Sequence, residues 1–558
     1  MEGCDKMTLF SLFLRMLAFK ARGFEKKTKD PLRAQKDILF EIIRRNRDTA
    51  YGREYSFGGV NSVKKYQNTC PVNTYESLYP YIERMTRGER DILTKDKPIL
   101  FGTTSGTTGL PKFIPVTNYS RKKKKDVMDI WLYYIIRDYP NILDGRILAI
   151  VSPERENCTV CGLSYGAESG HAYKNLPALI RMCYALPYNV FEIKDYEAKY
   201  YCILRLAMAQ KISTIATLNP STLILLCQKI DGFRDRIIED IENGTLRGDM
   251  DIEDDIRKFI EKRLRPDPRR AAFLRKILDE KGELLPRYFW PKLRLIECWK
   301  GGTVGIYLRE FERYFGNTPV RDFGYLSSEA RCSVPTDNAK CCGVLAINAN
   351  FYEFVPREDR EKMYERVLLC DELELGKEYF VIITTPGGLY RYDIDDLIRV
   401  TGFHNKTPRI EFIQKGLNVT SVTGEKLYES QVVEAVKKAA GLTGVTMEFF
   451  TACIQWGRMP RYVFLVEFKE TPQFEAKHRL LKFIDDEIKT LNVEYEVKRR
   501  SQRLDDPILK VVKRGAFEKY KVMKVETGAH DTQFKAPQLT RDLDFQCNFD
   551  IEEEIHLK

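Results

Sequence analysis

The sequence predicts an α/β protein, because short apolar runs typical of strands alternate with longer amphipathic helical patterns. The chain has 558 residues, of which 43% are hydrophobic and 31% are charged. This composition excludes a disordered, collagen-like or coiled-coil protein. Since strands that alternate with helices form crossover units, we expect a largely parallel sheet. The expected strands are 98–101, 146–152, 212–218, 293–297 and 344–348, and the expected helices include 32–47, 196–210 and 222–242.

The N-terminal segment 7–19, MTLFSLFLRMLAF, is expected to form an amphipathic helix. Arg15 interrupts it, and Lys20 and Arg22 follow it where a secretion signal would have small residues for cleavage. The segment is also shorter than the ~18 apolar residues that a membrane-spanning helix needs. We therefore expect a cytoplasmic protein whose first helix packs on the body or binds weakly to a membrane, without stable membrane insertion.

A basic run at 121–125, RKKKK, is the main concentration of positive charge in a chain whose formal net charge is +11. Val127, Ile130 and Trp131 follow at helical spacing, so the run is expected to begin an amphipathic helix. Nucleic-acid binding would need more such patches with interleaved aromatic residues. We expect a solvated helix face and no nucleic-acid partner.

The pattern changes near Phe412, where a second domain is expected to begin. A helix is predicted at 426–440, followed by a strand at 462–467 and a helix at 478–491. These elements form a compact α+β unit. The sequence therefore predicts two domains, residues 1–413 and residues 414–558.

The segment 101–112, FGTTSGTTGLPK, is predicted to bind a polyphosphate. Its glycines let a phosphate approach the backbone, its hydroxyls donate hydrogen bonds, and its lysine adds a positive charge. A flexible surface turn is the alternative, but a turn needs neither five hydroxyl groups nor a terminal Pro-Lys. The order of residues differs from that of a Walker loop. The candidate ligands are Thr104, Ser105, Gly106, Thr107, Thr108, Gly109 and Lys112.

This loop closely resembles the phosphate loop of the adenylate-forming enzymes, which include acyl-CoA synthetases and luciferases. Segment 323–329, FGYLSSE, resembles the Tyr-x-Ser-Ser-Glu motif of one branch, the Gretchen-Hagen-type auxin-responsive acyl acid–amido synthetases. The resemblance implies that Tyr325 flanks the adenine, that Ser328 belongs to the nucleotide site and that Glu329 helps to hold Mg²⁺. A carboxylate is a suitable hard ligand for magnesium shared with phosphates.

Segment 390–397, YRYDIDDL, resembles the family pattern Tyr-Arg-Tyr-x-x-Gly-Asp-Val/Leu. The aspartate that grips the ribose hydroxyls in the family falls on Asp396. The glycine before it is replaced by Asp395, which identifies the chain as a divergent member. This extra carboxylate could disturb the turn or repel the nucleotide, or it could face solvent.

Two lysines are the predicted catalytic residues. Segment 412–432 resembles the family hinge, and Lys426 lies in its best-matching piece, Gly424 to Leu427. Segment 533–537, QFKAP, resembles the closing Gln-x-Lys-x-Pro motif, whose lysine, here Lys535, reaches the reacting phosphate. The implied fold is a large multi-layer N-terminal domain of the luciferase-like type with a small mobile C-terminal lid.

The resemblance implies an ATP- and Mg²⁺-dependent ligase. It would adenylate a small carboxylic acid and pass the acyl group to an amine, commonly an amino acid, and we expect it to be a monomer. Two alternatives stay open. One is an acyl-CoA ligase with a thiol acceptor, and the other is a degenerate, non-catalytic nucleotide-binding homologue, which the change at Asp395 would favour.

Overall fold

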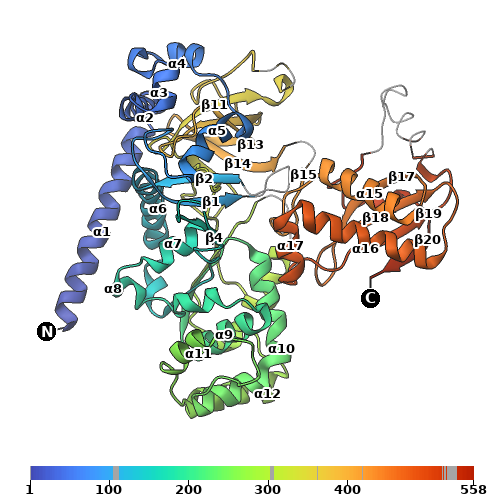
Figure 1. Ribbon diagram of the computed structural model, residues 1–558. Coiled ribbons are helices and arrows are strands. Elements are labelled where there is room, and N and C mark those ends of the chain that lie inside the picture. The colour runs from blue at the N-terminus through green and yellow to red at the C-terminus, as the bar shows by residue number, and fades with distance from the viewer. Residues whose placement is uncertain are drawn as a thin grey trace. The chain divides into compact units, whose positions relative to one another are not determined.

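The computed structural model describes residues 2–104, 112–301, 307–360, 362, 364–416, 419–517, 519–520, 523 and 537–557 (Figure 1). Contacts between its Cα atoms divide the chain between Gln414 and Lys415 into two compact units, with Lys112 grouped with the second. Helices and strands alternate along most of the larger unit, so the α/β prediction is confirmed.

Helices of the larger unit begin and end at residues that suit helix termini. Asp30 caps α2 by accepting a hydrogen bond from the Arg33 amide, and Pro31 occupies the first helical position. Helix α10 ends at Gly244, whose φ of +70° suits a glycine. The helices are α1 (Glu2–Lys27), α2 (Pro31–Asn46), α3 (Ala50–Glu54), α4 (Val63–Thr69), α5 (Tyr75–Thr86), α6 (Asn118–Asp138), α7 (Glu168–Lys174), α8 (Ala178–Arg181), α9 (Tyr196–Met208), α10 (Pro220–Asn243), α11 (Asp254–Glu261), α12 (Pro268–Lys281), α13 (Pro286–Phe289) and α14 (Phe311–Phe315).

One sheet of the larger unit is parallel, as expected. Its strands lie in the order β3-β6-β7-β8, and each neighbouring pair runs in the same direction. Parallel neighbours need long crossover connections, which the intervening helices supply. The strands are β3 (Arg146–Ala149), β6 (Ile212–Ala216), β7 (Leu295–Glu297) and β8 (Val320–Arg321). Strands β3, β6 and β7 are shorter than predicted but lie where they were predicted, whereas β8 was not predicted.

The largest sheet contradicts the expectation of largely parallel pairing. Its order is β11-β12-β13-β14-β10-β9, and the pairs β11–β12, β12–β13, β10–β14 and β9–β10 are all antiparallel. Short connections such as residues 385–391 can join only antiparallel neighbours. The strands are β9 (Ser333–Val334), β10 (Gly343–Leu345), β11 (Phe351–Pro356), β12 (Glu378–Thr384), β13 (Tyr392–His404) and β14 (Thr407–Lys415).

A third sheet of the larger unit, in the order β2-β1-β5-β4, leads to the predicted phosphate loop. Its strands are β1 (Pro98–Thr104), β2 (Lys112–Thr117), β4 (Asn157–Cys158) and β5 (Ser164–Gly166). Strand β1 pairs in parallel with β5, with Phe101 opposite Tyr165. The loop therefore begins at the carboxyl end of a sheet strand, where ligand loops commonly lie.

The smaller unit is an α+β fold. Its main sheet has the order β17-β18-β19-β20, and α15 packs against α16 over a core that includes Val436, Phe464 and Ile484. Its elements are β15 (Val419–Thr420), β16 (Leu427–Tyr428), α15 (Glu429–Thr443), β17 (Met447–Gln455), β18 (Arg461–Phe468), α16 (Phe474–Leu491), α17 (Val493–Arg500), β19 (Ile508–Val512) and β20 (Ile551–His556). The helix predicted from residue 426 begins instead at Glu429, because Leu427 and Tyr428 pair with β15.

Candidate active site

Polar segments follow the carboxyl ends of three adjacent parallel strands in the larger unit. After β6, the Leu218 carbonyl accepts a hydrogen bond of 2.9 Å from the Trp299 amide, which follows β7. The Cys298 amide in turn donates to the Arg321 carbonyl of β8 at 3.1 Å. The three segments therefore lie side by side at the edge where open α/β sheets bind ligands.

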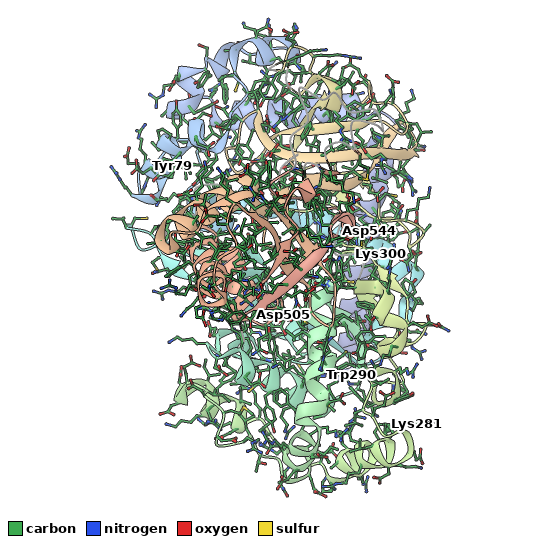
Figure 2. The ribbon with its side chains drawn as sticks, turned by 90° about the vertical axis from the view of Figure 1, so that its right-hand side faces the viewer. Tyr79, Lys281, Trp290, Lys300, Asp505 and Asp544 are labelled. Carbon is green, nitrogen blue, oxygen red and sulfur yellow. The ribbon has the colours of Figure 1, made fainter. Side chains whose placement is uncertain are left out.

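A tight turn after β8 places Tyr325. The carboxylate of Asp322 accepts hydrogen bonds from the amides of Gly324, at 2.6 Å, and Lys300, at 3.0 Å; Lys300 is labelled in Figure 2. Gly324 has φ of +80°, and a Cβ atom there would lie 2.7 Å from Cδ of Pro335. Only glycine fits this backbone, so the turn fixes the direction in which Tyr325 leaves the strand.

Tyr325 and Asp396, predicted from separate motifs, meet in the interior. The Tyr325 hydroxyl donates a hydrogen bond of 2.6 Å to Oδ2 of Asp396, and both residues are buried. The Tyr325 ring stacks on Phe412 at 5.5 Å between centroids. Burial, together with the Asp396 charge, raises the pKa of Tyr325 well above its usual value, so the hydroxyl stays protonated and donates.

Asp395 lies in a bulge of β13, where the family pattern has glycine. Phe380 of β12 faces Leu397 and Ile382 faces Asp393, so the residues between 393 and 397 bulge out of register. Asp395 has φ of +58°, a left-handed conformation that aspartate tolerates better than most residues.

The extra carboxylate has a counterion. Arg360 donates to Oδ1 of Asp395 at 2.8 Å and to Oδ2 of Asp393 at 2.6 Å. The guanidinium also lies 4.4 Å from the centroid of the Phe380 ring. Two adjacent carboxylates thus have different partners, since Asp395 pairs with Arg360 and Asp396 accepts from Tyr325.

Ser328 connects the tyrosine motif to the start of the predicted phosphate loop. Its hydroxyl donates to the carbonyl of Thr103 in β1 at 3.3 Å. Lys124 of α6 donates to the Ser328 carbonyl at 2.8 Å and pairs with Glu168 at 2.5 Å. The neighbouring Glu329 is buried. A buried carboxylate of this kind is chemically suited to Mg²⁺, which needs only one or two protein carboxylates when phosphates supply the remaining ligands.

The basic run at 121–125 is a solvated face only in part: Lys122 and Lys125 are exposed as predicted, but Lys124 is not. Lys124 is half-buried against Ser328, and Arg121 donates to Nε2 of His171 at 2.8 Å. Sequence reasoning missed Lys124 as a site residue. The helical spacing does indicate that Lys124 faces the protein, because Lys124 lies on the same helical stripe as the buried residues Val127 and Trp131.

Several predicted residues lie at or beyond the limits of the described chain. Ser105, Gly106, Thr107, Thr108, Gly109 and Lys535 lie outside the described residues. Thr104 ends β1 and Lys112 begins β2, so the two described ends of the loop are the ends of strands.

Lys426 lies in the smaller unit, in the turn between β15 and β16. The carboxylate of Glu425 holds this turn by accepting from the amides of Val422 and Thr423, at 2.8 and 2.7 Å. Asn492 donates to the Lys426 carbonyl at 3.0 Å, which ties the turn to the start of α17.

Sequence reasoning also missed two ionisable groups with shifted pKa values, the buried Glu297 and the half-buried Lys498. Burial raises the pKa of Glu297, at the end of β7, to about 8, although Arg321 and Arg331 oppose the shift. Burial lowers the pKa of Lys498 in α17 to about 7, and the charges of Arg503 and Lys426 act in the same direction. No local motif marks either residue, because each shift arises from tertiary packing.

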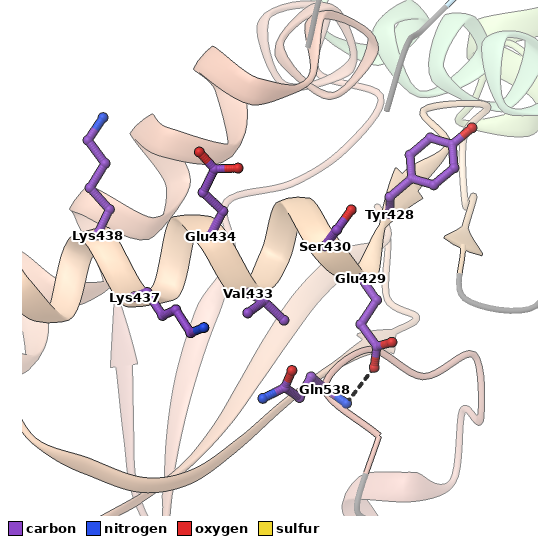
Figure 3. Close-up of a pocket in the computed structure, with 8 residues that line it drawn as sticks. All are labelled: Tyr428, Glu429, Ser430, Val433, Glu434, Lys437, Lys438 and Gln538. Carbon is purple, nitrogen blue, oxygen red and sulfur yellow. Dashed lines mark hydrogen bonds between the residues drawn. The ribbon is translucent and has the colours of Figure 1, made fainter. Parts of the chain in front are cut away.

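An open groove in the smaller unit is lined by none of the residues named from the nucleotide motifs. It follows one side of α15 (Figure 3). Among the residues that line it, the backbone amide of Gln538 donates a hydrogen bond of 2.9 Å to the Glu429 carboxylate. Its lining residues are Tyr428, Glu429, Ser430, Val433, Glu434, Lys437, Lys438 and Gln538. The mixture of both charges on an exposed helix gives it no clear ligand preference.

The parallel sheet, with polar segments beyond the carboxyl ends of its strands, defines an α/β protein of the kind that binds ligands at that edge. Three domain matches cover most of its length. The GH3 family N-terminal domain matches residues 20–320, the GH3 family central domain matches 343–415, and the GH3 family C-terminal domain matches 430–544. The chain belongs to the GH3 family, which confirms the resemblance found in its motifs.

Curated relatives match nearly the full length. The jasmonoyl–L-amino acid synthetase JAR4 of Nicotiana attenuata is 25% identical over 537 residues, 92% of each chain. The indole-3-acetic acid-amido synthetase GH3.4 of Arabidopsis thaliana is 26% identical over 541 residues, covering 92% of this chain and 90% of the relative. The solved structure of GH3.15 acyl acid amido synthetase shares the fold, with a TM-score of 0.65 at 22% identity and 96% coverage of both chains.

Within the described residues, no helix has the length and apolar character needed to cross a membrane.

Proposed function

We propose that this chain is an ATP-dependent acyl acid–amido synthetase that joins a carboxylic acid to an amine, with an amino acid as the acceptor. The observation that carries the proposal is the buried hydrogen bond between Tyr325, which follows β8, and Asp396, in the bulge of β13. Ser328 of the same motif as Tyr325 bonds to Thr103 of β1, where the predicted phosphate loop begins. Relatives named for joining jasmonic or indole-3-acetic acid to amino acids support the reaction class.

In the first proposed step, a carboxylate oxygen attacks the α-phosphorus of ATP, and the bond to pyrophosphate breaks. The nucleophile and the phosphate are both anions, and two unit charges ~4 Å apart repel by about 4 kcal/mol at an effective dielectric constant near 20. Positioned cations offset this repulsion. We assign Lys112 and the loop from Thr104 to Gly109 to the outer phosphates, and Lys535 to the reacting phosphate.

Tyr325 and Asp396 are proposed to fix adenosine, with the tyrosine against the adenine and the aspartate on the ribose hydroxyls. Ser328 holds the motif against β1. We assign Glu329 to a magnesium ion, which when bound would neutralise phosphate charge. Because Arg360 pairs with Asp395, the residue that replaces the family glycine has a cation that offsets part of its repulsion of the nucleotide.

In the second proposed step, the amine nitrogen attacks the acyl carbon, the bond to AMP breaks, and the nitrogen loses a proton. Lys426 belongs to the hinge segment on which the smaller unit is proposed to turn between the two steps. Such a movement would exclude water from the adenylate and then admit the amine. We also propose that the enzyme acts as a monomer in the cytoplasm.

The proposal is tested in two measurements. Acid-dependent exchange of pyrophosphate into ATP detects adenylation, and amino-acid-dependent release of AMP detects transfer. Coenzyme A replaces the amino acids in a parallel reaction. Exchange with transfer to coenzyme A alone would establish a thiol ligase instead. No exchange with any acid, and no binding of Mg·ATP by calorimetry, would show a non-catalytic homologue.

A further inference from the structure

Helix α1 exposes a stripe of large apolar side chains. It packs on α6 through the buried residues Leu17, Ala21 and Phe24, and Figure 1 shows it along the outer edge of the larger unit. On the opposite side, Leu12 is 64% exposed and Phe19 is 78% exposed, with Met16 at 38% between them. The spacing of these three residues is that of one helix face.

The charges that flank this stripe have one sign. Arg15 and Arg22 are exposed on one side, with Lys26 in line with them, and Lys27 is exposed on the other. No exposed residue between Ser11 and Lys27 is acidic. The single carboxylate of this part of the helix, that of Glu25, is half-buried and accepts hydrogen bonds from Tyr134 and His404.

The apolar stripe and the cations beside it together indicate what kind of partner this face of α1 can bind. A second copy of the same face would bring like charges together, which opposes association. A helix with an apolar stripe between rows of Lys and Arg is the pattern that lies in the interface of an anionic bilayer. Such binding needs no helix that spans the membrane.

We propose that the outer face of α1, which we define as Leu12, Arg15, Met16, Phe19, Arg22, Lys26 and Lys27, docks the enzyme on an anionic lipid surface. Leu12, Met16 and Phe19 enter the boundary between headgroups and acyl chains, and the four cations lie among the headgroups. Leu17 and Phe24 continue to hold the helix on α6, so docking requires no unfolding of the larger unit.

The test is co-sedimentation of the full chain with phosphatidylcholine vesicles, with or without about 30 mol% phosphatidylserine. We expect binding to the anionic vesicles only, and less of it as salt is raised. Leu12→Ser with Phe19→Ser should weaken binding about tenfold or more, since about 1.4 kcal/mol corresponds to a factor of ten. Arg15→Glu with Arg22→Glu should weaken it by more than about tenfold, because each reversal replaces an attraction to the anionic headgroups by a repulsion.

Matched variants on the smaller unit provide the controls. Leu442→Ser removes a side chain that is 59% exposed, and Lys482→Glu reverses an exposed charge; both should bind as the parent chain does. Equal binding to neutral vesicles, or α1 variants that bind as the controls do, would overturn the proposal. So would a concentration-dependent dimer in light scattering that the Leu12/Phe19 variant abolishes, because the face would then join two copies of the chain.

Discussion

The hydroxyl of Tyr325 and the carboxylate of Asp396 form a buried hydrogen bond that a substitution would leave half-satisfied. Tyr325→Phe keeps the ring that stacks on Phe412 but removes the donor, and a buried acceptor without a donor costs about 1–3 kcal/mol. We expect the dissociation constant for Mg·ATP, measured by calorimetry, to rise about tenfold. Tyr495→Phe is the control, because it breaks another buried Tyr–Asp pair, with Asp485 in the smaller unit. It should lower thermal stability without weakening ATP binding, and equal ATP affinity in both variants would contradict the role of Tyr325.

Asp395 and Arg360 form a compensating pair at the position where the chain departs from its family. Arg360→Met would leave the carboxylates of Asp393 and Asp395 without this cation, next to a proposed site for an anionic nucleotide. We expect the affinity for Mg·ATP to fall about threefold to tenfold, as for a change of roughly 1 kcal/mol in a charge–charge term. Adding Asp395→Gly should restore most of the affinity, since it removes the extra charge and suits the positive φ. If the double variant stays as weak as Arg360→Met, the arginine acts through packing on Phe380 and not through charge.

At the scale of elements, α6 supports the Ser-Ser-Glu segment through Lys124. Lys124→Met keeps most of the side-chain volume but removes the donor to the Ser328 carbonyl and the partner of Glu168. We expect acid-dependent pyrophosphate exchange to slow about tenfold, because misplacing a catalytic segment slightly has effects of that size or more. Lys122→Met is the matched control, since Lys122 is exposed on the same helix and should leave the rate unchanged. Equal rates for the two variants would show that α6 does not position the segment.

The elements show which parts of the fold the sequence could predict. Helical periodicity located α10 and strand-like runs located β6 and β7, because each pattern is local. Antiparallel pairing of β12 with β13 was missed, since an apolar run does not record the direction of its neighbour. The residues Tyr325 and Asp396 were predicted as candidates from separate motifs, but the hydrogen bond between them could not be predicted, because it joins residues far apart in the chain. The partner of Asp395 could not be found either, because nothing near Arg360 marks it as a counterion.

At the scale of the whole molecule, the chain has two units with separate cores, and each contains a part of the proposed chemistry. The larger unit contains the proposed nucleotide residues Tyr325, after β8, and Asp396, in the bulge of β13, and the smaller contains Lys426 in a turn held by Glu425. Unfolding is therefore not expected to be a single two-state transition, and stability must be followed unit by unit. The tryptophans make this possible, because Trp131, Trp290 and Trp299 lie in the larger unit and Trp456 lies in the smaller.

The buried carboxyl of Glu297 makes the stability of the larger unit depend on pH. Its pKa is raised to about 8 in the folded chain from an ordinary value of 4.5, so the folded state retains a proton that the unfolded state releases. This contribution to stability is fully present below pH 4.5 and is lost as pH rises through about 8.

In a Trp456→Phe background, the free energy of unfolding from urea titrations should fall over this window, with a slope of up to about 1.4 kcal/mol per pH unit from this group. Glu297→Gln should flatten that slope and stabilise the unit at pH 8, whereas Glu239→Gln, an exposed carboxyl of α10, should not. Identical slopes in the parent and in Glu297→Gln would mean that Arg321 and Arg331 keep the carboxylate charged.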